Sequence, residues 1–154
     1  SLFCFFLRRR LSVYLLKKLG YNISRGAMVI ISKGKIFRSY IESRYPFGEF
    51  ALIRSRGNLG EVGFVLADEN IEHWPSLYRE AWEITSYFRL RIKELGLDNI
   101  AMAGVGKDLD FITASIVVDL SALEKEEIEE IADQIMSILK ETNPYYKKGG
   151  KIDE

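Results

Sequence analysis

Apolar and polar positions follow two periods along this chain, and these periods predict the order of its helices and strands. Apolar residues at helical spacing predict helices at residues 4–19, at about 75–95, and from Ser121 to about 142. Short apolar runs bounded by turn residues predict six strands, at 27–32, 36–45, 49–56, 61–67, 100–105 and 109–120. The predicted order is therefore α-β-β-β-β-α-β-β-α.

Turn signals separate these elements. Lys33–Lys35, Gly57–Gly60 and Gly106–Asp108 have the glycine content expected of turns. Ser121 and Glu124 have the spacing of a capping box, in which two side chains bond the first backbone N–H groups of a helix. This pair is predicted to open the last helix.

The predicted fold class follows from this order. Four successive strands joined by short turns favour an antiparallel meander, and strand 109–120 alternates clearly between two faces. A length of 154 residues fits one domain. We expect a single α+β domain over residues 1–142, with a mostly antiparallel sheet of five or six strands and helices packed chiefly on one face. Residues 143–154 are expected to form a polar tail.

The long middle helix carries two apolar stripes. Its main stripe steps by three or four residues and consists of Leu77, Ala81, Ile84, Phe88, Ile92 and Leu95. Trp74, Tyr78 and Trp82 form an adjacent stripe, which makes the apolar face wider than one sheet contact requires. The second stripe belongs either to the core or to a homodimer interface, because such interfaces favour Trp and Tyr.

Charge is distributed unevenly, although 22 Lys/Arg balance 22 Asp/Glu overall. Residues 1–60 hold twelve basic side chains against Glu42 and Glu49, and the acidic excess lies in residues 61–154. Arginines and aromatics share faces of two predicted strands and form a candidate anion or nucleic-acid face: Arg38, Tyr40, Arg44, Arg54 and Arg56. These arginines either contact phosphates or pair with carboxylates of the acidic half.

Candidate chemistry is sparse. His73 is the only histidine, and it could act with Glu69 and Glu72 as a general base or a metal site. No second histidine and no pair of cysteines supplies zinc-type spacing. We therefore predict no catalytic, cofactor-binding or metal-binding residues, and keep a metal-dependent hydrolase or nuclease at Glu69, Glu72 and His73 as an alternative.

The N-terminal segment is read as the start of an amphipathic helix. Its apolar residues precede Arg8–Arg10, the reverse of a secretory signal, and they are far fewer than the ~18 of a membrane span. Met28 is a candidate alternative start. A single cysteine, Cys4, suggests a reducing cytoplasm, and one glutamine among many charged residues is a thermophile tendency.

Two segments carry a resemblance to a known family. Leu15–Tyr21 looks like the end of a first helix, and Val117–Ser121 looks like the last strand-to-helix step of the type III secretion chaperone-like fold, which includes YbjN-like proteins. The chain resembles this pattern over about residues 10–142. The resemblance implies a non-enzymatic dimer that binds other polypeptides, with the middle helix helping to form the dimer.

Three functions are thus expected, in order. The first is a non-catalytic cytoplasmic binding protein, a homodimer through the helix at 75–95 with a possible protein client. The second is nucleic-acid binding by the basic strands. The third is the metal-dependent enzyme.

Overall fold

The computed structural model of the chain describes residues 23–24, 27–28, 31–46, 51–66, 74–108 and 111–142. Contacts divide the chain into two units, residues 1–32 and 33–154, and each is described by itself. In the first, β1 (Ile23–Ser24) pairs antiparallel with β2 (Ala27–Met28). The predicted helix at 4–19 and the tail at 143–154 lie outside the described residues. The single domain expected over 1–142 stays a prediction.

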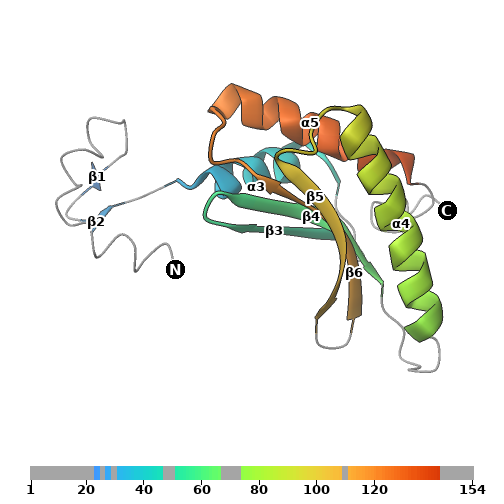
Figure 1. The fold of residues 1–154 in the computed structure, drawn as a ribbon. Coiled ribbons are helices and arrows are strands. Elements are labelled where there is room, and N and C mark those ends of the chain that lie inside the picture. Colours follow the sequence, from blue (N-terminus) through green and yellow to red (C-terminus); the bar gives the residue numbers. More distant parts are fainter. Residues whose placement is uncertain are drawn as a thin grey trace. The chain divides into compact units, whose positions relative to one another are not determined.

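The second unit is an α+β fold with an antiparallel sheet (Figure 1). Its described elements are α3 (Lys33–Arg44), β3 (Ala51–Arg56), β4 (Leu59–Leu66), α4 (Trp74–Glu94), β5 (Ala101–Asp108), β6 (Phe111–Asp119) and α5 (Lys125–Glu141). The strands lie in the order β3-β4-β6-β5, and each neighbouring pair is antiparallel. The α+β class is confirmed. The prediction of five or six strands is wrong for the described residues, whose main sheet has four.

Residues 36–45, predicted as a strand, lie mostly in helix α3. Ile36, Phe37, Tyr40 and Ile41 have the β-branched and aromatic composition of a strand, yet their spacing also fits one helical stripe. Phe37 and Ile41 are fully buried in the core. The predicted turn at Lys33–Lys35 is the first turn of this helix. Burial of one stripe therefore decided between two conformations that composition left open.

Close approach of the backbone fixes the start of α3. The Gly34 N–H donates to the Gly57 carbonyl at 2.9 Å. A Cβ atom on Gly34 would lie 2.5 Å from the Leu59 carbonyl oxygen and 2.6 Å from that of Gly57. Only glycine fits so close to the β3–β4 turn.

The helices α4 and α5 follow their predictions closely. α4 begins one residue before Pro75, and Gly96, with φ of 72°, ends it as expected of a C-terminal cap. α5 begins later than predicted, because its capping box is formed by Glu124 and Glu127 instead of Ser121 and Glu124. Ser121 instead hydrogen-bonds Asp119 through its hydroxyl and its N–H.

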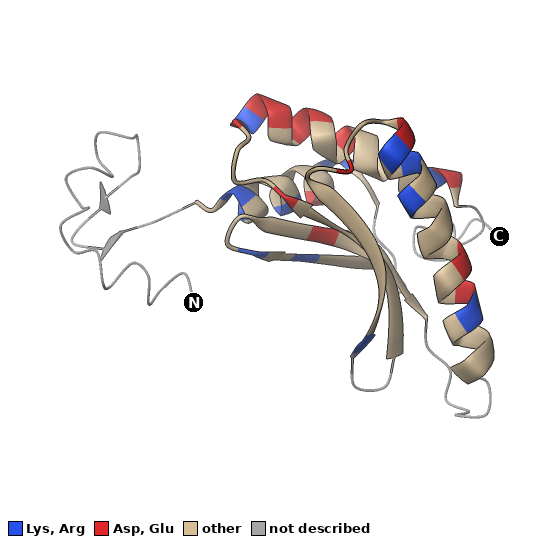
Figure 2. Ribbon diagram, in the orientation of Figure 1, with Lys and Arg blue, Asp and Glu red and all other residues tan. Residues whose placement is uncertain are grey.

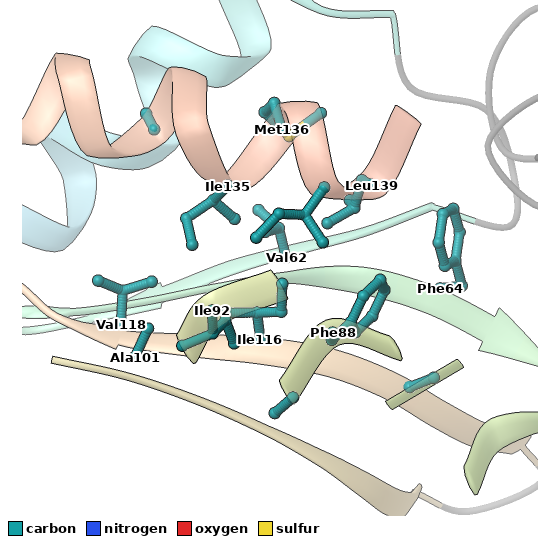
Figure 3. Close-up of a cluster of buried hydrophobic side chains, with 14 of the residues drawn as sticks. Val62, Phe64, Phe88, Ile92, Ala101, Ile116, Val118, Ile135, Met136 and Leu139 are labelled. Atoms are coloured by element: carbon teal, nitrogen blue, oxygen red, sulfur yellow. The ribbon is translucent and has the colours of Figure 1, made fainter. Parts of the chain in front are cut away.

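The three helices that the structure describes in the second unit cover one face of the sheet, and the core lies between helices and sheet (Figure 1). Figure 3 shows α5 and α4 side chains meeting the sheet around Val62, Ile116 and Val118. The Phe64 and Phe88 rings stack with centroids 6.3 Å apart. The alternation predicted for strand 109–120 is confirmed, since the residues of one face are fully buried: Ile112, Ala114, Ile116, Val118 and Leu120.

Polar contacts tie the helices to each other. The Tyr40 and Tyr45 hydroxyls of the α3 segment donate to the Asp133 carboxylate of α5 at 2.8 and 2.7 Å. Arg91 of α4 forms an ion pair with Glu141 of α5 at 2.8 Å. Figure 2 shows acidic residues along α5, whereas most of β5 carries no charge.

Candidate binding site on the open face of the sheet

The face of the sheet turned away from the helices carries side chains from all four strands. Since Val62 and Phe64 point into the core, alternate β4 residues such as Glu61 and Gly63 point to this open face. The register places Arg54, Glu61, Val117 and Met102 in one cross-strand row. The next row consists of Leu52, Gly63, Ser115 and Gly104.

A hollow of about 240 Å³ lies on this face, lined by Arg54, Glu61, Met102, Ala103, Gly104, Val105, Gly106, Thr113, Ser115 and Val117. Its depth comes from two glycines of β5, because Gly104 is paired with Ser115 and Gly106 with Thr113. With no side chains on β5 at these positions, the two hydroxyl-bearing residues of β6 form the floor.

One carboxylate organises the polar groups of the hollow. The Ser115 hydroxyl donates to one oxygen of Glu61 at 2.6 Å, and the Arg54 Nε donates to the other at 2.9 Å. Ser115 is only 5% exposed, whereas Arg54 reaches solvent. Hydrogen bonds thus connect a hydroxyl, a carboxylate and a guanidinium, an arrangement that suits recognition of a polar group.

Apolar side chains surround these polar groups. Met102 is 73% exposed, and its cross-strand neighbour Val117 is also exposed. Leu59, 44% exposed, lies on the same face at the far end of β4 and does not line the hollow. Several exposed apolar side chains on one surface are typical of an interaction site.

The hollow adjoins an edge of the sheet, because β5 is the last strand in the order. The Ile100 carbonyl accepts from the Asp119 N–H, so it points toward β6. Successive residues alternate, and the backbone groups of Ala101, Ala103, Val105 and Lys107 therefore point outward. Within the described residues, the Ala101 N–H donates to the Leu97 carbonyl at 2.8 Å, and the Ala103 carbonyl accepts from Arg89 Nε at 3.2 Å.

The residues of the predicted anion face are split between two elements. Arg38, Tyr40 and Arg44 lie on α3, on the helical side of the sheet, so their predicted shared strand face is wrong. Arg54 and Arg56 lie on the open face of β3 as predicted. Arg38 pairs with Glu42 at 3.2 Å, and the Arg44 guanidinium lies 4.8 Å from the centroid of the Tyr40 ring. Nucleic-acid binding stays a prediction, and the structure places its candidate residues on two different elements, α3 and β3.

The aromatic stripe of α4 is divided between the core and solvent. Trp74 and Tyr78 are half-buried and pack against the core, whereas Trp82 is 50% exposed. Lys107 Nζ lies 4.8 Å from the Trp74 ring centroid, so this side of α4 runs beside β5. Arg89, which bonds Ala103, lies 5.5 Å from the Trp82 ring.

The metal-site alternative cannot be placed, since Glu69, Glu72 and His73 lie outside the described residues. Elsewhere, among residues that the structure describes, no three His, Cys, Asp or Glu side chains gather as metal ligands would. No helix in the described part of the chain has the length and apolar content needed to cross a membrane.

Sequence reasoning missed the hollow. The predicted alternation of strand 109–120 places Thr113, Ser115 and Val117 on one face, but the preceding strand was predicted to end before Gly106. The predicted turn at Gly106–Asp108 is in fact part of β5. The spacing of Gly104 and Gly106 could have indicated the hollow, because both glycines fall on the same face of one strand.

Comparison of the chain with protein-family models, with curated proteins and with solved structures gave no significant match. Function is therefore inferred from the geometry of the described residues.

Proposed function

We propose that this protein is a non-catalytic binding protein that binds other polypeptides at the β5 edge and the neighbouring hollow, and that it acts as a homodimer. One observation carries the proposal: Met102, Val117 and Trp82 are exposed around a single sheet edge whose backbone groups point outward. This is also the behaviour that the resemblance to secretion chaperone-like proteins implies.

Strand addition is the binding mode that suits this edge. An extended polypeptide can bond the outward N–H and C=O groups of Val105 and Lys107, while its side chains enter adjacent pockets. The backbone bonds give affinity without sequence preference. The hollow beside Gly104 and Gly106 accepts one side chain and supplies selectivity.

A titration with an unfolded polypeptide tests the binding function. Reduced, carboxymethylated α-lactalbumin serves as the probe, and the amide and methyl signals of the protein are followed by NMR. We expect shifts confined to β5 amides and to the Met102 and Val117 methyls. The methyl of Met136, which is buried in the core, is the internal control and should not move. Absence of any shift at β5 in protein that is monomeric under these conditions would contradict the proposed function.

A further inference from the structure

We infer that the polypeptide bound at this edge is β5 of a second copy, paired antiparallel about a twofold axis at Gly104 to give one continuous eight-stranded sheet. This rests on the proposed function that the β5 edge binds a polypeptide. It goes further in naming the partner and the register.

The two edges of the sheet differ in how they are protected. β3 is a six-residue strand and carries Arg54 and Arg56, charged residues of the kind that discourage edge pairing. β5 is eight residues long, and its charged residues, Lys107 and Asp108, are confined to one end. Its remaining positions are small or apolar. β5 is therefore the edge prepared for pairing.

The alternation of β5 permits a self-complementary register centred on Gly104. In that register Ala103 faces Val105 of the second copy, and Ala101 faces Lys107. All four of these residues have outward backbone groups, so Ala103 and Val105 of the two copies can exchange both hydrogen bonds. The Ala101 N–H already donates to the Leu97 carbonyl at 2.8 Å, so the facing pair of Ala101 and Lys107 makes one bond, from the Lys107 N–H to the Ala101 carbonyl. The Ala103 carbonyl retains a second lone pair beside its bond to Arg89. Lys107 meets an alanine, so no like charges are directly opposed.

The side chains of this register are complementary in shape. Met102 projects from the open face and is 73% exposed, and it would face Gly106 of the second copy. Gly106 and Gly104 leave the hollow beside them empty of side chains. Each copy thus offers one protruding methionine and one hollow beside two glycines, and the twofold axis places each methionine at the other's hollow.

The interface extends from β5 onto the neighbouring side of helix α4. Arg89 and Trp74 contact β5 residues, so this side of α4 follows the edge. Trp82 lies two turns before Arg89 on that side. Joining two β5 strands would bring the two α4 helices together and cover Trp82. The homodimer expected through α4 would then be centred on the pairing of the two β5 strands.

Site-directed cross-linking tests the register. In a non-hydrogen-bonded antiparallel pair the Cα atoms lie about 4.5 Å apart, within the range that a disulfide spans. A Cβ on Gly104 meets no atom within 4 Å, so Gly104→Cys should fold. The variant Cys4→Ser/Gly104→Cys is oxidised at micromolar concentration and separated on a non-reducing gel. Cys4→Ser/Leu59→Cys, which also exposes its thiol on the open face, is the control.

We expect a covalent dimer to form at least about tenfold faster with Gly104→Cys than with the control. Met102→Glu should weaken the dimer at least about tenfold by light scattering, and Leu59→Glu should not. A dimer that cross-links no faster at position 104 would overturn the register and leave the proposed function standing. A monomer whose β5 amides still respond to unfolded polypeptide would overturn only the second copy as partner. A monomer without that response would contradict both the second copy as partner and the proposed function.

Discussion

Asp133 shows how one residue can join two helices. Its carboxylate accepts hydrogen bonds from the hydroxyls of Tyr40 and Tyr45, which belong to the α3 segment. Burial, followed by the hydrogen bond and the charge of Asp133, raises the pKa of Tyr45 to about 12. The neutral phenol is favoured in the folded state because it alone can donate to the carboxylate.

The raised pKa of Tyr45 predicts a loss of stability in alkaline solution. Below about pH 10 the phenol is protonated in both states, and its stabilisation is fully present. Between about pH 10 and 12 the unfolded chain has lost the proton and the folded protein keeps it, so stability falls as pH rises. Urea midpoints of wild type and Tyr45→Phe should therefore converge across this window. A difference between the two midpoints that stays constant from pH 9 to 12 would contradict the assignment.

At the scale of the elements, alternation was a reliable guide and composition was not. β6 was correctly predicted because its four inward positions alternate with polar or exposed ones. α3 was misread because its Ile, Phe and Tyr residues are typical of strands. A segment of ten residues can fit the period of a helix and the period of a strand in part. The surface that it packs against then decides which side chains are buried.

Replacement of Gly34 by alanine tests how α3 packs, because helix propensity and packing predict opposite effects on stability. Alanine is the better helix former, yet Gly34→Ala should destabilise by about 1–3 kcal/mol, because the new Cβ would collide with two backbone carbonyls. Ser39→Ala, at an exposed position of the same helix, is the matched control and should change stability by less than about 0.5 kcal/mol. Urea denaturation of both variants makes the comparison. A stabilising Gly34→Ala would mean that α3 is not held against the β3–β4 turn.

At the scale of the whole molecule, the helices that the structure describes in the second unit all cover one face of the sheet, and no described helix covers the other. Sequence reasoning expected helices on one side but placed the candidate binding residues on basic strands. The structure instead brings Glu61, Met102 and Ser115 together from three strands. No local pattern connects these positions, since residues 61 and 115 meet only through the β4–β6 pairing.

Trp82 tests whether the molecule associates through the α4 side. We expect Trp82→Glu to weaken a homodimer by about 2 kcal/mol, or about thirtyfold in Kd, because a large aromatic side chain that the interface would bury is replaced by a charge. Sedimentation or light scattering at micromolar concentration measures the effect, with Leu59→Glu as the control. A wild-type protein that is monomeric under these conditions would contradict the proposed homodimer.

The sequence by itself determined α4, α5, β3, β4 and the alternation of β6, because each has a period of burial that is visible over its own length. Tertiary structure alone decided that residues 33–44 are helical, because burial of Phe37 and Ile41 outweighed their strand-like composition. It also decided the hollow, whose depth depends on which residues of β6 face Gly104 and Gly106. That register is set by contacts between strands, and a pattern within one strand carries no record of it.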